Sequence, residues 1–408
     1  MLWDREDLKK PDLILLVAFA GLLLVGLMVI YSATHGAHPE ISQNFAKQVI
    51  WILVGLGLLA LLSLLPFKLY HEIAIPFYII SILLLIAVLF VGGGTGVKRW
   101  FIFGPVRLQP SELAKIATLL LLAKYAANAK RDFKKIKDIV VAFAIVILPT
   151  LLIIKQPDLG TSLVFIAMVL PVLFWAGLSL FTVFLLLAPL VTLASAFTFY
   201  SFFIAIVLIV GVMVVSGRGP KIIIPNFLLN IGVGIVTPIL WEQLLGYQKS
   251  RILTFIGLEQ DPQGLGYQVL QSKVAIGSGG LWGKGWMQGT QTQLRFLPEQ
   301  HTDFIFSVLG EEFGFLGVCV VLALFFILIW RALLIAQNSK NLFASLIVIG
   351  ACTIIGFHVI VNTGMTVGIM PVTGLPLPFL SYGGSSLLTN TALIGLIINA
   401  GRRRFQYL

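Results

Sequence analysis

The chain has 408 residues, of which 58% are hydrophobic and only 11% are charged. An ordinary globular protein is about 45–50% apolar and about 25% charged. Because so few charges cannot cover a water-soluble fold of this length, the composition excludes soluble, disordered, fibrous and disulfide-scaffold classes. It predicts an all-α polytopic membrane protein, in which lipid is the solvent for most of the chain.

The 28 Lys and Arg residues exceed the 17 Asp and Glu residues, which gives a formal net charge of +11. In a soluble protein this excess would suggest nucleic acid, but cytoplasmic loops of membrane proteins collect Lys and Arg for reasons of insertion alone. Cys319 and Cys352 lie in apolar runs and are expected to be core thiols. The N-terminal MLWDREDLKK is not followed by a small-residue cleavage site, so the first hydrophobic run is expected to remain as an anchor.

A transmembrane helix needs about 20 consecutive apolar residues. Twelve segments of the chain fit this requirement approximately, and the run 160–216 is almost uninterrupted. The segments lie near residues 12–32, 46–65, 73–92, 111–127, 138–154, 160–177, 181–197, 201–216, 223–244, 304–330, 342–363 and 385–400.

Basic residues predict the orientation of these spans. With the N-terminus in the cytoplasm, the NAKRDFKKIKD loop and the GRRR tail also lie inside, as the insertion rule requires, and both termini are cytoplasmic. The basic residues assigned to the inner side are Arg5, Lys9, Lys10, Lys68, Lys130, Arg131, Lys134, Lys135, Lys137, Arg218, Lys221, Arg331, Lys340, Arg402, Arg403 and Arg404.

About eleven basic residues fall at or near the outer side, where the insertion rule does not explain them. They indicate either an anionic ligand on that face or a set of ordinary exposed side chains. No stretch alternates aromatic and basic residues, so nucleic acid is not expected as a partner. The outer basic residues are Lys47, Lys98, Arg99, Arg107, Lys115, Lys155, Lys249, Arg251, Lys273, Lys284 and Arg295.

The outer loop 246–303, about 58 residues long, is too long for a simple connection. Its segment GLGYQVLQSKVAIGSGGLWGKGW predicts an interfacial helix that runs into a Gly-rich turn. The run GSGGLWGKG could hold a phosphate with its backbone N–H groups and Lys284, or it could be only a turn. It lacks Walker spacing, so a nucleotide P-loop is not expected.

The loop ends in LPEQHTDFIFSVLGEEFGF, where Thr302 is predicted to cap the next helix and Asp303 to lie in its first turn. There the helix dipole would favour an ionised carboxylate at the outer membrane boundary. The alternative is that both residues only cap the helix. His301 could carry a proton or be an ordinary loop histidine.

Several ionisable side chains lie within or beside the predicted spans. Glu112 and Lys115 are three residues apart and share a helix face, Glu311 and Glu312 follow Asp303 by about two turns, and Asp158 lies between two spans. Such groups need partners in protein or water. They form either an internal ion-pair network or a binding site, and both require a polar cavity.

Two irregular outer segments are predicted to line that cavity. GGGTGVKRWFIFGPVRLQP places Trp100 beside Lys98 and Arg99, and GIMPVTGLPLPFLSYGGSS interrupts the chain before the last span. The sequence contains no HExxH, no GxSxG and no paired Cys/His spacing, so zinc and serine hydrolases are not supported.

Five long strings appear in order along most of the chain: GVKRWFIFGPVRLQPSELAKI, KQPDLGTS, GYQVLQSKVAIGSGGLWGKGW, LPEQHTDFIFSVLGEEFGF and PLPFLSYGGSS. They closely resemble the SEDS family of shape, elongation, division and sporulation proteins, and QSKVAIGSGGLWGKGW followed by GTQTQL is more similar to the rod-shape branch than to the division branch. The resemblance implies one integral-membrane helical bundle over residues 1–408. About 12 transmembrane helices are expected, ten of the family and two inserted near 178–225, with a long ordered extracytoplasmic loop at 246–303.

The resemblance further implies a peptidoglycan glycosyltransferase that polymerises lipid II at the outer face of the bacterial cytoplasmic (inner) membrane during cell elongation. A class B penicillin-binding protein transpeptidase and other proteins of the elongation machinery are the implied partners. The family's essential outer-loop aspartate falls on Asp303, which would act as general base for the attacking 4-hydroxyl.

The diphosphate of lipid II needs cations, for which the outer side offers Lys98, Arg99, Lys273 and Arg251. No cofactor is obligatory, and a divalent cation (Mg2+ or Mn2+) is an optional aid. The full set of candidate substrate-binding residues is Lys98, Arg99, Trp100, Glu112, Lys115, Asp158, Arg251, Lys273 and Ser385.

Two other functions stay open from the sequence. A lipid II flippase would also have intramembrane Glu112, Lys115, Glu311 and Glu312 and broken helices near Pro376. The sequence shows no clear inverted repeat, and the reactive residues gather on one side, which favours an enzyme. A structural scaffold of the elongation machinery is the third class.

Overall fold

The computed structural model describes residues 10–35, 39–93, 98–104, 106–217, 219–243, 246–255 and 265–403. Arg5, Lys9, Arg218 and Arg404, which entered the orientation argument, and residues 94–97 of the Gly-rich segment lie outside these ranges. The chain divides into two compact units, Met1–Ala176 with Asp261–Leu408 as unit 1 and Gly177–Gln260 as unit 2.

Helices make up almost all of the regular structure, as the composition predicts. Unit 1 contains α1 (Leu13–Thr34), α2 (Pro39–Leu64), α3 (Phe67–Val91), β1 (Phe101–Phe103), β2 (Val106–Leu108), α4 (Pro110–Ala126), α5 (Ile136–Ile154), α6 (Leu159–Trp175), α11 (Leu265–Gly279), α12 (Thr290–Gln293), α13 (Ile305–Asn338), α14 (Leu342–Thr366) and α15 (Gly384–Arg402). Unit 2 contains α7 (Leu180–Ser195), α8 (Phe199–Val215), α9 (Pro220–Gln243) and α10 (Gly246–Phe255).

Each of the twelve predicted spans corresponds to a helix. Among the described residues, seven helices are long and apolar enough to cross a membrane, and α6, α7 and α8 are shorter apolar helices. The count of twelve spans therefore stays a prediction, while the multi-pass helical architecture is confirmed. The all-α prediction needs one addition, the short antiparallel hairpin in which Phe101 pairs with Leu108 and Phe103 with Val106.

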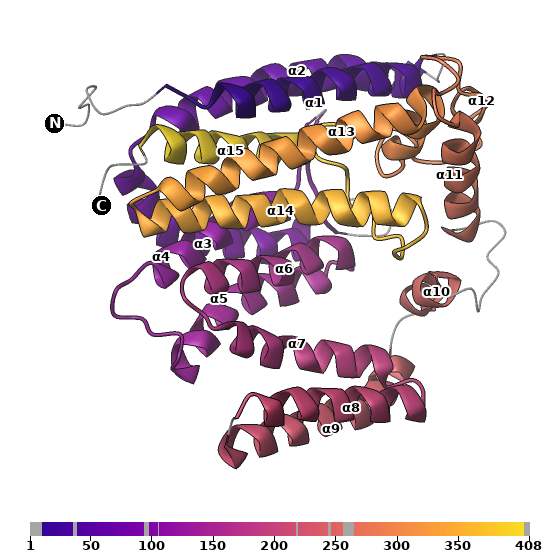
Figure 1. The fold of residues 1–408 in the computed structure, drawn as a ribbon. Helices are drawn as coiled ribbons and strands as arrows, with labels where there is room; N and C mark the ends of the chain where they lie inside the picture. The colour runs from indigo at the N-terminus through magenta and orange to yellow at the C-terminus, as the bar shows by residue number, and fades with distance from the viewer. Residues whose placement is uncertain are drawn as a thin grey trace. The chain divides into compact units, whose positions relative to one another are not determined.

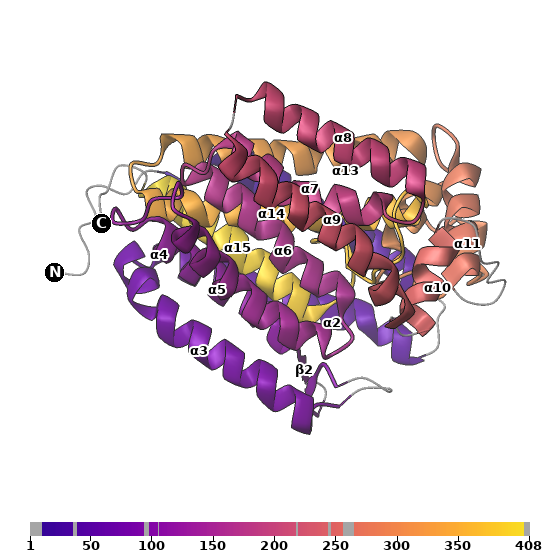
Figure 2. The ribbon, with the colours of Figure 1, turned by 90° about the horizontal axis from the view of Figure 1, so that it is seen from below.

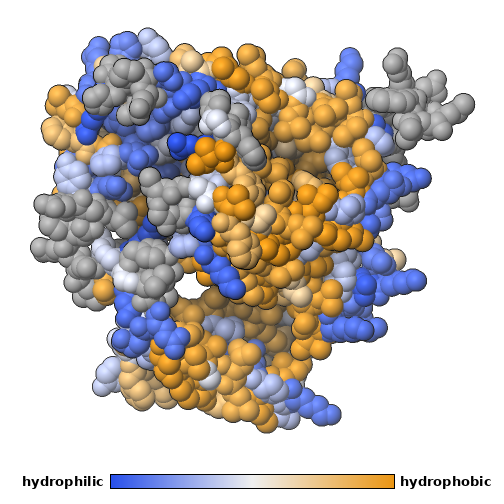
Figure 3. Space-filling model, turned by 180° about the vertical axis from the view of Figure 1, so that it is seen from behind, coloured by the Kyte–Doolittle hydropathy of each residue, from blue (hydrophilic) through white to orange (hydrophobic). Residues whose placement is uncertain are grey.

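Large apolar side chains are exposed along the helices. Phe90 is 75% exposed and Leu53 is 64% exposed, and Figure 3 shows hydrophobic residues over much of the face that it draws. Exposing so many apolar side chains to water would be unfavourable, whereas exposing them to the hydrocarbon of a bilayer would not. The surface is therefore the one expected of a protein embedded in lipid.

Helix α14 is the most buried of the candidate spans in unit 1, with 78% of its apolar window inside the protein. It packs against α13, α6, α15 and α4, and Figures 1 and 2 both place it among these helices. Any polar side chain on α14 must therefore find a protein partner, because neither lipid nor bulk water reaches most of its surface.

One end of unit 1 holds the beginning of α1 and the end of α15 (Figure 1). The Asp12 side chain caps α1 by accepting from the Leu15 N–H at 3.0 Å, and its carboxylate also accepts from Arg331 Nε of α13 at 3.0 Å. At the same end, Asn399 Nδ2 donates to the carbonyls of Leu62 and Leu65, each at 2.6 Å. The opposite end holds α11, α12 and the C-terminal end of α14.

Unit 2 has its own small core. Ala188, Ile209 and Met213 pack together from α7 and α8, and the buried Thr192 hydroxyl donates to Asn230 Oδ1 of α9 at 2.7 Å. Unit 2 covers the region near 178–225 that is predicted to be a two-helix insertion. That assignment stays a prediction.

The outer loop 246–303 is ordered where it is described and contains α10, α11 and α12. The predicted helix followed by a Gly-rich turn is confirmed as α11 and the turn after it. This helix packs against α13 and α14, although Leu270 is 58% exposed and Val274 is 43% exposed. Protein therefore covers one side of α11, and the interfacial position in a bilayer stays a prediction.

Helix α13 is broken at Gly314, which has φ 65° and ψ −164°. The break opens four backbone groups, and the Gly-rich turn satisfies all of them. Lys284 N and Gly285 N donate to the carbonyls of Glu311 and Glu312, each at 3.0 Å, while Phe315 N and Leu316 N donate to the carbonyls of Gly280 and Leu281 at 2.9 and 3.2 Å. The turn thus replaces the missing hydrogen bonds of a kinked helix.

We predict that Gly314→Ala is strongly destabilising. A Cβ on Gly314 would lie 2.2 Å from Gly283 N, and the positive φ disfavours any residue with a side chain. The free energy of unfolding should fall by about 3 kcal/mol or more, measured by thermal melting of the detergent-solubilised protein.

The matched control is Gly57→Ala in α2, where a Cβ would meet nothing within 4 Å. This change should be neutral or stabilising by about 0.5–1 kcal/mol, because alanine is the better helix former. Equal melting temperatures for the two variants would contradict the importance of the break.

Candidate active site

Asp303 lies two residues before α13, which begins at Ile305 with Phe304 as its N-cap residue. The prediction that Thr302 caps this helix and that Asp303 lies in its first turn is therefore wrong. The Thr302 hydroxyl instead donates to the Glu299 carbonyl at 3.1 Å, within a preceding turn. Asp303 still stands at the N-terminal end of α13, but it is presented by an irregular segment.

Three hydrogen bonds hold the backbone of this segment. The carbonyls of His301, Thr302 and Asp303 accept, in turn, from Tyr382 N at 2.9 Å, Ser381 Oγ at 2.6 Å and Asn362 Nδ2 at 2.8 Å. Three consecutive carbonyls are thus fixed by groups from α14 and from the segment after it. The direction in which the Asp303 side chain leaves the backbone is fixed with them.

The segment 367–383, between α14 and α15, forms the wall beside Asp303. A Cβ on Gly374 would lie 3.4 Å from Asp303 Oδ2, and Gly374 has φ 75°. The Leu375 carbonyl accepts from the same Asn362 Nδ2 at 2.8 Å. The unwound backbone predicted for GIMPVTGLPLPFLSYGGSS is therefore present, and it lies directly against the aspartate.

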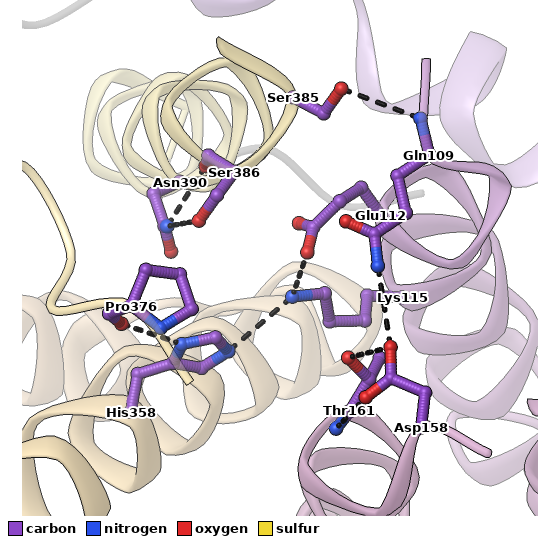
Figure 4. A network of polar contacts seen from close by, with 10 residues as sticks. All are labelled: Gln109, Glu112, Lys115, Asp158, Thr161, His358, Pro376, Ser385, Ser386 and Asn390. Carbon is purple, nitrogen blue, oxygen red and sulfur yellow. Dashed lines mark hydrogen bonds and ion pairs between the residues drawn. The ribbon is translucent and has the colours of Figure 1, made fainter. Parts of the chain in front are cut away.

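A second polar group is buried between α4, α14 and α15 (Figure 4). Lys115 Nζ lies 2.9 Å from Glu112 Oε1 and 3.3 Å from His358 Nε2, and His358 Nδ1 lies 3.1 Å from the Pro376 carbonyl. Lys115 and Glu112 are only 1% and 4% exposed. The predicted ion pair is thus present, and it includes a histidine that was not predicted.

The Glu112 carboxylate points toward Ser386 and Asn390 of α15 (Figure 4). Glu112 Oε2, Ser111 Oγ and Asn390 Oδ1 are buried without a hydrogen-bond partner among the described residues. Buried polar atoms normally find a partner in protein or water. The polar cavity that the sequence requires stays a prediction.

Asp158 joins this group as the N-cap of α6. Its carboxylate accepts from Thr161 N at 3.1 Å, from Thr161 Oγ1 at 3.0 Å and from Gln109 Nε2 at 3.3 Å. Arg99 supports the preceding turn by donating to the carbonyls of Gln156, at 2.8 Å, and Pro157. Arg99 thus serves the wall of the site through backbone carbonyls.

Segment 367–383 connects the two polar groups. Its Leu375 carbonyl accepts a hydrogen bond from Asn362, and its Pro376 carbonyl contacts His358 Nδ1. A Cβ on Gly160, two residues after Asp158, would lie 2.7 Å from the Thr373 carbonyl, so α6 begins in close contact with the same segment. The Asp303 segment and the Glu112–Lys115 pair therefore share one rigid wall.

Three further predicted residues lie close in the chain to β1 or contact β2. The Ser385 hydroxyl donates to the Arg107 carbonyl at 3.0 Å and accepts from Gln109 N at 3.4 Å. The Trp100 carbonyl accepts from Gly93 N at 2.9 Å. Lys98 is exposed, and its Nζ donates to the Phe90 carbonyl at 3.2 Å.

The remaining two predicted cations, Lys273 and Arg251, belong to different units. Lys273 is an exposed residue of α11, and a Cβ on Gly368 would lie 2.2 Å from its Cε, so Lys273 crosses the turn after α14 in unit 1. Arg251 belongs to α10 in unit 2. A shared role of Arg251 with the cations of unit 1 therefore stays a prediction.

Glu311 and Glu312 are buried and paired to different elements. Glu311 accepts from Lys284 Nζ at 2.8 Å and from the backbone N–H groups of Gln291 and Thr292 at 2.9 and 3.0 Å, so it caps α12. Glu312 accepts from the Ser32 hydroxyl of α1. These contacts favour the internal-network explanation for both acids.

The same contacts argue against a phosphate cradle at GSGGLWGKG. The N–H groups of Lys284 and Gly285 donate to carbonyls of α13, and the Lys284 ammonium is engaged by Glu311. The turn interpretation is the one that the structure favours, with the specific role of closing the break in α13.

His301 lies beside Asp303, with its ring centroid 5.9 Å from that of Tyr382. Burial, which disfavours the imidazolium, lowers the pKa of His301 below 6.5, and the nearby Glu299 carboxylate opposes this only in part. His301 is therefore mainly neutral at pH 7, which fits an ordinary loop histidine.

Within the described ranges, no three His, Cys, Asp or Glu side chains come together in a way that could hold a metal ion. The carboxylates of Glu112, Asp158 and Glu311 are engaged with Lys115, Thr161 and Lys284, respectively. The divalent cation stays an optional prediction, and no step proposed below uses it.

Sequence reasoning missed His358, Asn362, Ser381 and Asn390. A signal for two of them was present, because His358 and Asn362 are four residues apart in an otherwise apolar span and must share one face. The partners of these side chains are mostly backbone carbonyls of distant segments, which no local pattern reveals.

The fold and the site together define a multi-pass membrane protein in which one unwound segment contacts both a fixed aspartate and a buried Glu–Lys–His group. The family model described as "Cell cycle protein", which covers FtsW, RodA and SpoVE, matches residues 13–206 and 198–406. The chain therefore belongs to this family, the SEDS family expected from its motifs.

The chain is similar over nearly its whole length to curated members. It is 38% identical to the peptidoglycan glycosyltransferase MrdB of Escherichia coli strain K12, covering 98% of this chain and 95% of that protein. It is 35% identical to the peptidoglycan glycosyltransferase RodA of Treponema pallidum, covering 96% and 98%.

Two solved structures have the same fold. One is described as showing the structural coordination of polymerization and crosslinking by a peptidoglycan synthase complex, with a TM-score of 0.73, 30% identity and coverage of 99% of this chain and 100% of that one. The other is the rod shape determining protein RodA of Thermus thermophilus, with a TM-score of 0.63, 28% identity and coverage of 97% and 98%.

We predict that Lys115→Met lowers the free energy of unfolding by about 3–5 kcal/mol, because it leaves the buried Glu112 carboxylate without its cation. The double variant Glu112→Gln/Lys115→Met should recover most of this loss. Thermal melting of the purified protein measures both.

The exposed pair Lys68–Glu72, 4.0 Å apart on α3, is the matched control. Lys68→Met should change stability by less than about 1 kcal/mol, because water screens this pair. If Lys115→Met lowered the free energy of unfolding no more than Lys68→Met, the buried network would not contribute to stability.

We predict that His301→Gln reduces the loss of stability on acidification. Because the pKa of His301 is lowered in the folded protein, the unfolded chain binds the proton first, and stability falls as the pH drops below about 6.5. The wild type should lose up to about 1.4 kcal/mol per pH unit more than the variant in this window. Parallel melting curves from pH 7.5 to 5.5 would contradict the burial effect.

Proposed function

We propose that the chain is a peptidoglycan glycosyltransferase that polymerises lipid II into β-1,4-linked glycan at the outer face of the bacterial cytoplasmic membrane during cell elongation. The names of the full-length relatives support the activity. The observation that carries the proposal for this chain is the aspartate beside the unwound segment 367–383, where three successive backbone carbonyls are held by hydrogen bonds.

Asp303 is the general base of this reaction. Its carboxylate takes the proton from the 4-hydroxyl of the acceptor sugar as that oxygen attacks C1 of the donor sugar. The C1–O bond to the lipid diphosphate breaks, and the diphosphate leaves with the electron pair. This single displacement inverts the α-linked donor into a β-linked product, and the base contributes about 10²–10⁴-fold to the rate.

The leaving group carries two phosphates, which need cations rather than a second carboxylic acid. Lys273 and Lys98 are exposed cations of unit 1 that would hold these phosphates. The role of Arg251, which belongs to unit 2, stays a prediction from the sequence. Arg99 and the Glu112–Lys115 pair, which are engaged with protein groups, shape the cavity around the substrate. Trp100, Asp158 and Ser385 complete its walls.

The chain works as a multi-pass protein with both termini in the cytoplasm, so that Asp303 faces the outside. A class B penicillin-binding protein that crosslinks the new glycan is its partner, together with other proteins of the elongation machinery. The similarity to a complex in which polymerization and crosslinking are coordinated supports this partnership.

The general-base role is tested by lipid II polymerisation with purified wild type and Asp303→Asn. The variant keeps the size of the side chain but loses the base, so the rate of glycan synthesis should fall by about 10²–10⁴-fold. The matched control is Glu299→Gln, an exposed acid in the same turn, which should keep wild-type activity. A folded Asp303→Asn enzyme with near-normal synthesis would refute the assignment.

The flippase alternative is separated by supplying lipid II only to the outer face of proteoliposomes. A polymerase makes glycan under these conditions, whereas a flippase makes none. Translocation of labelled lipid II without any glycan would replace the proposed function. A scaffold predicts instead that Asp303→Asn supports normal growth in cells.

A further inference from the structure

A row of buried polar side chains follows one face of α14. His358, Asn362 and Thr366 are spaced by four residues, so they lie on the same side of the helix, and each is 0% exposed. Polar groups buried in an apolar helix cost stability unless their hydrogen bonds are made. His358 and Asn362 contact segment 367–383, Asn362 also contacts the Asp303 carbonyl, and the Thr366 carbonyl contacts Ser272 of α11.

Asn362 occupies the middle of this row and makes two bonds with one amide. Its Nδ2 donates to the carbonyl of Asp303 and to the carbonyl of Leu375, both at 2.8 Å. Both amide hydrogens are thereby used. One side chain thus joins the start of α13 to segment 367–383, two stretches that lie about sixty residues apart in the sequence.

The neighbouring residues complete the attachment. One helical turn before Asn362, His358 contacts the Pro376 carbonyl. One turn after it, the Thr366 carbonyl accepts from the Ser272 hydroxyl at 2.6 Å, and that hydroxyl lies 2.6 Å from Ser307 Oγ of α13. The helix therefore holds segment 367–383 directly, and it is linked to the first turn of α13 through Ser272 of α11.

An aspartate has only two side-chain torsions, so its carboxylate follows its backbone closely. The carbonyl of Asp303 itself is the atom that Asn362 holds, and the two preceding carbonyls are held by Ser381 and Tyr382. Phe304, the next residue, is 1% exposed and packs with Leu297, Met365 and Val372. Of the three groups that hold these carbonyls, the Asn362 amide is the one that bonds to Asp303 itself.

We infer that Asn362 is a positioning residue for the polymerisation reaction: by fixing the Asp303 carbonyl against segment 367–383, it holds the Asp303 carboxylate at the place where the acceptor hydroxyl must lose its proton. The inference rests on the proposed function of Asp303. Asn362 needs no contact with substrate for this role, and its removal should slow the chemical step rather than weaken substrate binding.

The chain contains a matched control for this residue. Asn399 of α15 is also 0% exposed, and its Nδ2 also donates to two backbone carbonyls, those of Leu62 and Leu65. It joins α15 to the α2–α3 connection, at the end of unit 1 opposite α11 and α12. Loss of either amide should lower stability in a similar way, but only loss of Asn362 should affect catalysis.

The experiment compares Asn362→Leu, Asn399→Leu and wild type in lipid II polymerisation, with rates normalised to folded protein. For Asn362→Leu, kcat should fall by about 10–100-fold, with KM for lipid II within about twofold of wild type. Asn399→Leu should keep both constants. Wild-type kcat for Asn362→Leu, or a raised KM with unchanged kcat, would overturn the inference.

If Asn362→Leu does not fold, Ser381→Ala decides the question, because it removes only the hydroxyl that holds the Thr302 carbonyl and the Leu377 N–H. Its control is Ser345→Ala, a buried serine on α14 whose hydroxyl donates to the Ala336 carbonyl at 2.8 Å. A several-fold lower kcat for Ser381→Ala alone, at about unchanged KM, supports positioning. Equal kcat for the two serine variants overturns it.

Asp303→Asn, measured in the same assay, separates the general-base role of Asp303 from the positioning role of Asn362. Full activity of Asp303→Asn would mean that the proposed base is wrong, whatever Asn362 does. An inactive Asp303→Asn beside a fully active Asn362→Leu would mean that Asp303 is the base and that Asn362 does not position it.

Discussion

The hydrogen bonds from the polar face of α14 are the constraint on which the rest of unit 1 depends. This helix is largely enclosed by protein, so His358, Asn362 and Thr366 cannot be satisfied by water or by lipid. The Asn362 amide donates to the carbonyls of Asp303 and Leu375, and His358 Nδ1 contacts the Pro376 carbonyl. The Thr366 hydroxyl donates to the Thr363 carbonyl of its own helix. The bonds of His358 and Asn362 thus pair polar side chains of α14 with backbone carbonyls of the irregular segments beside it.

The break in α13 is the second device of the same kind. Gly314 interrupts the helix inside an apolar span, and the Gly-rich turn after α11 supplies donors and acceptors to the opened ends. Glu311, next to the break, caps α12 and holds Lys284. Backbone hydrogen bonds to α13 and one buried acid therefore hold the part of the outer loop that follows α11.

The sequence predicted the helices well because long apolar runs have few other solutions in lipid. It also brought out Asp303, Glu112, Lys115 and Asp158, because charges beside apolar runs are rare and need partners. It placed the start of α13 too early, since the Thr302 hydroxyl bonds to Glu299 instead of capping the helix. The sequence did not predict that the Gly-rich run makes hydrogen bonds to the break in α13, because Gly314 lies in a separate segment of the chain.

The central claim is that the Asp303 segment is held rigidly by α14 before any substrate binds. Hydrogen–deuterium exchange of the amides of Thr302 and Phe304, both of which donate to the Glu299 carbonyl, tests it directly in the purified protein. The account predicts slow exchange in the wild type, close to that of the first turn of α13, and clearly faster exchange in Asn362→Leu. Rapid exchange of these amides in the wild type, or the same slow exchange in both proteins, would contradict it.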